Sequence, residues 1–231
     1  MSKRAYLTID DSPSRHFLER VELLQQKDII AIWFCLGKNL IQRRDEVIYA
    51  IQAGQIIANH TWDHPHFSEI SLEEGKDQIT RTDLLIEELY AAAGLDRKHK
   101  WFRFPYFDRG GKFSSQYQSY LRQKGYSHPG WADITYQYFD EYREGADWPV
   151  TLDCMEWVYG SRHENEYGLT SMTDIQDRIL ADNPEHGLGF HTDSTDIVLI
   201  HDHEKSDDRF TNLVDFLMGR GVDFIDPTRT I

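Results

Sequence analysis

The run Ala5-Tyr6-Leu7-Thr8-Ile9 has the apolar character of a buried strand, and the carboxylate pair Asp10-Asp11 follows it directly. Similar short runs recur at residues 29–34, 55–59, 101–104, 150–152, 196–200 and 222–225. Amphipathic helical segments separate many of these runs, and this alternation is typical of βα units around a parallel sheet or barrel. The sequence therefore predicts one α/β barrel domain that occupies residues 1–231.

The segments between the strand-like runs carry apolar residues at helical spacing. Each of the following sets shares one helical face: Phe17, Val21 and Leu24; Val47, Ile48 and Ile51; Ile86, Leu89, Tyr90 and Ala93; Phe210, Leu213, Val214 and Leu217. We expect these faces to pack on the outside of the barrel. Ser14, Ser71 and Thr173 are predicted helix N-caps, and the segment from Ser71 to Glu74 has the form of a capping box.

The composition disfavours several classes of partner. A formal net charge of −14 argues against nucleic acid, because phosphate binding needs clustered Lys and Arg. No apolar run reaches the length of a membrane span. The first residues show no secretory signal pattern, and Cys35 and Cys154 are too few for a disulfide framework, so we expect a cytoplasmic protein with reduced thiols. The sequence leaves the oligomeric state open.

Two motifs place metal-binding side chains after strand-like runs. Asp10 and Asp11 follow the first run, although Asp-Asp-Ser-Pro is also ordinary turn composition. His60 and His64 follow the run 55–59 and are four residues apart, so a helical turn would place both imidazoles on one side. Two imidazoles and one carboxylate make a three-ligand site with open positions. Spacing alone does not exclude Asp63 or His66 as ligands.

Two further motifs end strand-like runs later in the chain. The segment Arg103-Phe104-Pro105-Tyr106 ends the run 101–104, and Leu199-Ile200-His201 ends the run 196–200. Taken singly, Arg103 could form an ordinary ion pair and His201 could simply end a strand. Polar residues that follow several different strands converge at the C-terminal mouth of a barrel, where such enzymes assemble their sites.

In their order and spacing these motifs resemble those of the polysaccharide deacetylases, which are carbohydrate esterase family four and share the homology domain of the nodulation chitooligosaccharide deacetylase. The resemblance covers most of the chain and implies a distorted (β/α)7 barrel. It also implies a metal-dependent hydrolase that removes N-acetyl groups from amino sugars of an oligo- or polysaccharide, such as a chitooligosaccharide, and releases acetate. The implied cofactor is a divalent metal, zinc first and cobalt or nickel as alternatives.

The resemblance assigns roles to the motif residues around the reacting bond. It makes Asp10 the general base and Asp11, His60 and His64 the metal ligands. It places Arg103 beside the base and the backbone N–H of Tyr106 at the oxyanion. Ser12 and Phe107 depart from the family pattern, which usually has glycine at the first of these positions and often at the second.

The same resemblance makes His201 the general acid and Asp153 the partner that orients it and raises its pKa. Asp153 belongs to a looser motif, Asp-x-x-Asp-Trp, in which Glu156 replaces the second aspartate and Trp157 completes the pattern. Sugar rings present apolar faces, so Tyr106 and Trp157, as aromatic residues within motifs, are the predicted substrate-binding residues. Residues 127–148 show no clear period, and we expect an irregular excursion that forms part of a binding surface.

Two other functions remain open from the sequence. A related amidase could act on a cyclic amide or ureide that is not a carbohydrate. A catalytically inactive homologue could bind carbohydrate without turnover, and the departures at Ser12, Phe107 and Glu156 are compatible with it.

Overall fold

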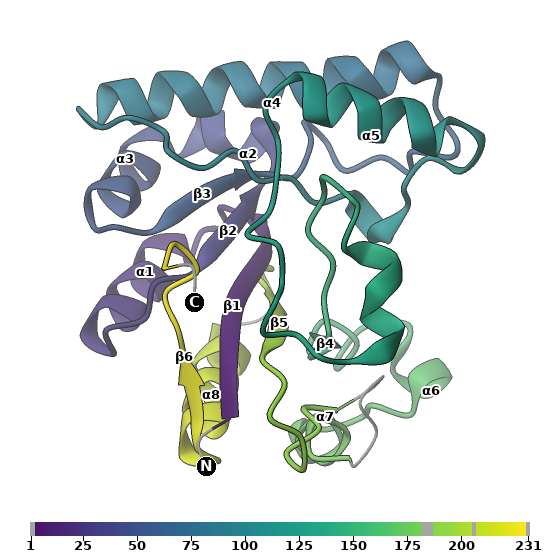
Figure 1. Ribbon diagram of the computed structural model, residues 1–231. Helices are drawn as coiled ribbons and strands as arrows, with labels where there is room; N and C mark the ends of the chain where they lie inside the picture. The colour runs from purple at the N-terminus through teal and green to yellow at the C-terminus, as the bar shows by residue number, and fades with distance from the viewer. Residues whose placement is uncertain (1–2, 182–186, 205–206, 230–231) are drawn as a thin grey trace.

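The computed structural model describes residues 3–181, 187–204 and 207–229 (Figure 1). Its strands are β1 (Lys3–Ser12), β2 (Ile32–Cys35), β3 (Ile56–Asn59), β4 (Leu152–Asp153), β5 (Asp196–His201) and β6 (Val222–Phe224). Its helices are α1 (Phe17–Gln26), α2 (Gly37–Gln42), α3 (Arg44–Gln52), α4 (Leu72–Ala92), α5 (Ser114–Gln123), α6 (Glu164–Tyr167), α7 (Met172–Ile179) and α8 (Asp207–Gly219). Short 3₁₀ helices cover Pro105–Phe107, Gly111–Phe113 and Gln137–Tyr142.

The strands form one parallel sheet that curls into a distorted barrel. β1 lies at its centre in the order β3-β2-β1-β5-β4, and β6 pairs with the start of β1. Between β3 and β4, Phe102 forms a parallel bridge with Asn59. The carbonyl of Phe102 accepts the N–H of Trp148 at 2.7 Å. In the described part of the chain, the six parallel strands and this bridge agree with the predicted α/β barrel. The predicted strand 101–104 is reduced to the single bridge, and β4 is only two residues long.

Alternation along β1 separates the two sides of the sheet. Tyr6 packs in the barrel interior with aromatic residues of other strands, whereas Ala5, Leu7 and Ile9 belong to the core between the sheet and the helices. Successive residues of a strand point to opposite faces. Thr8 and Asp10 therefore follow Tyr6 on the inner face, and this register places the first carboxylate of the pair inside the mouth of the barrel.

Helices cover the outside of the barrel, as the periodic patterns predict (Figure 1). The apolar faces of α1 and α8 are fully buried in the outer core. Burial of each such side chain is worth about 1.5–3 kcal/mol. Ser71 forms the predicted capping box with Glu74 at the start of α4. The other two predicted caps are wrong, because α1 begins only after His16 and α7 is capped by Ser171.

Residues 127–148 have an irregular backbone, as expected, and several of their large side chains are buried, so a role of this segment in a binding surface stays a prediction. Trp131, Ile134 and Phe139 are buried in the barrel interior, where the ring of Trp131 meets that of Trp148 edge-on at 4.4 Å between centroids. The irregular backbone of this segment closes the interior with aromatic side chains beneath the mouth. Among the described residues, no helix combines the length and apolar character needed to cross a membrane.

Candidate active site

A cavity of about 740 Å³ opens at the C-terminal ends of the strands. Side chains from several strand ends line it, and they include eight of the nine residues predicted from the sequence: Asp10, Asp11, His60, His64, Tyr106, Asp153, Trp157 and His201. The ninth, Arg103, is fully buried and contacts Asp10. The fold therefore brings all predicted site residues to one place, as expected for parallel strands that end at one mouth.

Arg103 holds Asp10 from inside the barrel. Its Nη1 donates to Asp10 Oδ1 at 2.7 Å and to Thr8 Oγ1 at 2.9 Å. Its Nε and Nη2 donate to the carbonyls of Trp148 and Pro149 at 3.1 and 3.0 Å. Burial lowers the pKa of Arg103, and the charge of Asp10 opposes that effect. A buried guanidinium with all three nitrogens engaged fixes one carboxylate oxygen of Asp10 and leaves the other toward the cavity.

Asp11, His60 and His64 form a candidate metal centre. Each offers one ligand atom, and these atoms lie within 4.8 Å of one another. His60 Nδ1 donates to the carbonyl of Arg103 at 2.9 Å, and this contact selects Nε2 as the ring nitrogen that can bind a metal. Asp11 Oδ1 lies 3.1 Å from His64 Nε2, yet this buried oxygen accepts no hydrogen bond from the described residues. An orphaned carboxylate oxygen between two imidazoles fits a divalent cation.

The charge states of Asp11 and His64 agree with this fit. Burial alone would raise the pKa of Asp11, but hydrogen bonding from His203 and the neighbouring histidines lower it well below its ordinary value. Burial and the nearby His60 lower the pKa of His64 to about 4. At neutral pH the centre therefore presents the ionised carboxylate of Asp11 and the neutral imidazole of His64 to a cation.

The structure separates the predicted ligands from the two alternatives. Asp63 accepts a hydrogen bond from Gln78 at 2.7 Å on the exposed side of its loop. His66 stacks on the ring of Tyr106 at 3.8 Å between centroids. Among the residues searched in the described part of the chain, neither joins the group formed by Asp11, His60 and His64.

The loop that carries His60 and His64 is not the helical turn that their spacing suggests. Thr61 and His64 have positive φ values of 75° and 69°, so the backbone bends rather than winds. Asn59, the last residue of β3, holds this bend, because its Oδ1 accepts the N–H of Thr61 at 2.8 Å. Its Nδ2 donates to the hydroxyl of Tyr126 at 2.7 Å. Sequence reasoning missed Asn59, although a buried amide at a strand end is a signal for such a clamp.

The carboxylate that contacts His201 is Glu156 and not Asp153. Glu156 Oε1 accepts the backbone N–H of His201 at 2.5 Å and lies 3.2 Å from His201 Nδ1. Asp153 Oδ1 instead accepts the N–H of Met155 at 2.8 Å. The predicted orientation of His201 by Asp153 is therefore wrong, because the longer Glu156 side chain occupies that place. Asp153 contributes to the imidazole only through its charge.

The same contacts set the protonation of His201. Burial alone would lower its pKa, but the charge and hydrogen bond of Glu156, with a smaller contribution from Asp153, raise the pKa to about 10. Burial would raise the pKa of Glu156, and the charge of His201 lowers it instead. At neutral pH the imidazole is consequently protonated and the carboxylate ionised.

Aromatic residues border the cavity. Tyr106 is 57% exposed, has φ of 55°, and meets His64 edge-on at 4.5 Å between centroids. Trp157 is half-buried and lies edge-on to His201 at 6.4 Å and to Tyr167 at 6.0 Å. Three other tryptophans do not line the cavity: Trp131 and Trp148 are buried in the barrel interior, and Trp62 packs beneath Arg81.

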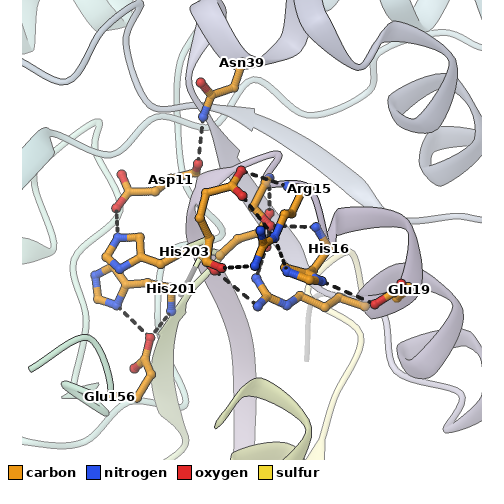
Figure 2. Close-up of polar contacts among 12 residues, drawn as sticks. Asp11, Arg15, His16, Glu19, Asn39, Glu156, His201 and His203 are labelled. Atoms are coloured by element: carbon orange, nitrogen blue, oxygen red, sulfur yellow. Dashed lines mark hydrogen bonds and ion pairs between the residues drawn. The ribbon is translucent and has the colours of Figure 1, made fainter. Parts of the chain in front are cut away.

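Two contacts to Asp11 were not predicted from the sequence (Figure 2). His203 Nε2 lies 2.7 Å from Asp11 Oδ2, and Asn39 Nδ2 donates to the carbonyl of Asp11 at 3.1 Å. Asp11 has φ of 66°, and most non-glycine residues with positive φ in the described chain lie in the site loops. Such backbone strain persists where the surrounding contacts over-determine a conformation, and it clusters at functional sites.

Comparison with known proteins agrees with this geometry. Residues 1–137 match the family profile described as polysaccharide deacetylase. The chain is 31% identical over 101 residues to a peptidoglycan-N-acetylglucosamine deacetylase of Bacillus cereus, and the match covers 43% of this chain and 35% of that protein. The matched region thus spans about a third of the length of this curated relative.

Solved structures show the same fold. A polysaccharide deacetylase from Bacillus cereus superposes with a TM-score of 0.65 at 20% identity, over 97% of this chain and 91% of that one. A pseudoenzyme of carbohydrate esterase family 4 from Bacillus anthracis superposes with a TM-score of 0.61 at 19% identity, over 97% and 64%. At these identities the similarity establishes the fold, a distorted (β/α)7 barrel, and leaves activity to be argued from the site.

Proposed function

Because this chain belongs to the polysaccharide deacetylase family, we propose that it is a metal-dependent hydrolase that removes N-acetyl groups from amino sugars of an oligo- or polysaccharide and releases acetate. The observation that carries the proposal is the convergence of three units in one cavity. These are a buried carboxylate held by Arg103, the Asp11–His60–His64 ligand group, and the protonated His201 held by Glu156. Each unit supplies one requirement of amide hydrolysis.

Asp11, His60 and His64 would hold the metal. A divalent cation bound there, zinc by preference, acts as a Lewis acid that polarises the acetyl carbonyl and makes water acidic enough to react near neutral pH. The orphaned Asp11 Oδ1 supports this assignment, as does the His60 tautomer fixed by the carbonyl of Arg103.

Asp10 would accept the proton of the attacking water. Arg103 binds one of its oxygens, so the second oxygen is the one presented to the cavity. A fixed carboxylate loses little freedom when the reaction begins, and this orientation favours proton transfer. The backbone N–H of Tyr106 is the proposed donor to the oxyanion, which needs stabilisation as charge develops on the carbonyl oxygen.

His201 would donate a proton to the departing amine. The free amine is a poor leaving group without protonation, and a positioned acid typically contributes about 10²–10⁴-fold to the rate. A pKa of about 10 keeps the imidazole charged at neutral pH, and the contact with Glu156 fixes its ring. Tyr106 and Trp157 would contact the apolar faces of the sugar rings at the border of the cavity.

An inactive carbohydrate-binding homologue is the second candidate, because one solved structure with this fold is described as a pseudoenzyme. The site of this chain argues against it, since base, ligand group and acid are all present in one cavity. Binding without turnover of any acetylated sugar, in protein with metal bound, would favour the inactive homologue.

A substrate panel and one variant test the proposal. We expect acetate release from N-acetylglucosamine oligomers or acetylated peptidoglycan and none from cyclic imides or ureides. Asp10→Asn should lower kcat by at least about 10²-fold while the metal content stays equal to that of the wild type, because the variant removes the base and no ligand. Activity on imides alone would instead identify the non-carbohydrate amidase, and full activity of Asp10→Asn would remove Asp10 from the base role.

A further inference from the structure

The two carboxylate oxygens of Asp11 lie in different surroundings. Oδ1 faces His60 and His64, at 3.7 and 3.1 Å from their Nε2 atoms. Oδ2 contacts Nε2 of His203 at 2.7 Å (Figure 2). One oxygen is thus left for a cation, and the other is already occupied by a protein donor.

His203 is not placed as a fourth ligand. Within the described residues, two groups have ligand atoms within 4.8 Å of one another, Asp11–His60–His64 and Asp153–Glu156–His201, and His203 belongs to neither. An ionised carboxylate can only accept hydrogen bonds, so the nitrogen of His203 that contacts it must carry a proton. A protonated ring nitrogen has no lone pair with which to bind a metal.

A rigid support carries His203. The N–H of Asp202 donates to the carbonyl of Asp10 at 2.9 Å, which extends the β1–β5 pairing past His201. The buried Asp202 carboxylate pairs with Arg20 and accepts from N and Oγ of Ser14, both at 2.7 Å. Arg20 Nη2 also donates to the carbonyl of His203 at 3.3 Å. The main chain of His203 is therefore fixed to the segment that follows β1 and to α1.

Asp11 needs such a support. Its backbone sits in the left-handed region with φ of 66°, and Asn39 holds its carbonyl. These contacts fix the main chain but leave rotation of the carboxylate free. A hydrogen bond to Oδ2 removes that freedom and leaves Oδ1 as the single oxygen directed at the imidazoles.

We propose that His203 is a positioning residue that holds Asp11 for monodentate binding of a divalent metal through Oδ1. The inference rests on the proposed function and deepens it. Partners that orient metal ligands typically change metal affinity by about 10–100-fold when they are removed. We expect a loss of this size in His203→Ala and recovery in His203→Gln, because a glutamine amide can place an N–H near the position of the imidazole Nε2.

The test measures the zinc dissociation constant of metal-stripped protein by competition with a chelator. Wild type, His203→Ala and His203→Gln are compared, with His191→Ala as a matched control, since His191 is exposed and lines a separate cavity beside Lys3 and Arg4. His191→Ala should bind zinc like the wild type. Thermal unfolding of the metal-free variants checks that each still folds, so that a change in affinity is assigned to the site.

The outcomes separate this inference from the proposed function. Wild-type protein that binds zinc, with His203→Ala unchanged in affinity, would overturn the positioning role and leave the metal centre intact. Wild-type protein that binds no zinc would overturn the metal centre itself. Loss beyond about 1,000-fold without recovery in His203→Gln, together with an altered absorption spectrum of the cobalt-loaded His203→Ala protein, would make His203 a ligand and contradict the proposal.

Discussion

Glu156 Oε1 binds His201 twice, through the backbone N–H at 2.5 Å and near the ring Nδ1 at 3.2 Å. The two contacts fix both the end of β5 and the plane of the imidazole, and the buried charge of Glu156 keeps the ring protonated. The carboxylate that prepares the proposed acid is therefore contributed by the position at which this chain departs from the Asp-x-x-Asp-Trp pattern.

Glu156→Gln should move the alkaline limb of the pH–rate profile to lower pH. The substitution removes the charge that raises the pKa of His201 to about 10, so burial is left to lower that pKa. The proposed acid then loses its proton at a lower pH, and kcat/KM at pH 8–9 should fall relative to the wild type. Profiles of kcat/KM against pH measure the shift.

Asp153→Asn is the matched comparison for that experiment. Among the contacts of the described residues, Asp153 makes no hydrogen bond to His201 and acts only through its charge. Asp153→Asn should therefore shift the alkaline limb of the pH–rate profile less than Glu156→Gln does. Equal shifts in both variants would show that the hydrogen bond of Glu156 contributes nothing beyond charge.

The contact between His201 and Glu156 should also make the free energy of unfolding depend on pH. His201 has a folded-state pKa raised from 6.5 to about 10, so its contribution to the free energy of unfolding is fully present below about pH 6.5 and is lost as the pH rises toward 10. Denaturant unfolding of metal-free protein at several pH values should show this decline. In His201→Gln the decline in stability between about pH 6.5 and 10 should be smaller than in the wild type. A decline equal to that of the wild type would show that other groups cause it.

Arg103→Ala should destabilise the fold strongly. The change leaves Asp10 in a buried setting without its cation and removes donors to Thr8, Trp148 and Pro149. Removal of one partner of a buried ion pair costs about 3–5 kcal/mol. Denaturant unfolding measures the loss, and Arg229→Ala, which breaks a pair whose arginine is exposed, should change stability by less than about 0.5 kcal/mol.

Two tryptophan variants separate the core from the substrate-binding surface. Trp131→Ala should lower the free energy of unfolding by about 3–5 kcal/mol, because Trp131 is buried among the aromatic residues of the barrel interior. Trp157→Ala should instead raise KM for an acetylated oligosaccharide, because Trp157 is half-buried and lines the cavity. Unfolding of Trp157→Ala, or normal stability of Trp131→Ala, would reverse these assignments.

The parts of the fold that follow local patterns could be predicted from the sequence. The apolar runs before Asp10, His60 and His201 mark β1, β3 and β5, because buried parallel strands read as apolar runs. The outer helices follow from helical periodicity. Convergence of the motif residues then follows from parallel strands that share one mouth.

The remaining features depend on tertiary placement that a sequence pattern does not carry. The reach of Glu156 to His201 depends on one methylene group and on the backbone path after β4. The position of Trp131 in the barrel interior does not follow from a periodic sequence pattern, because residues 127–148 fold irregularly. The bend at Thr61 comes from the side chain of Asn59, whose partners Ile79 and Tyr126 are distant in sequence.

The most direct test of the central claim is acetate release from an N-acetylglucosamine oligomer by metal-stripped protein, measured before and after zinc is restored. The account predicts little release from the stripped protein and recovery of release with zinc, because Asp11, His60 and His64 would then hold the metal beside Asp10 and His201. Release that is independent of metal, or no release from any acetylated sugar by protein that demonstrably binds zinc, would contradict it.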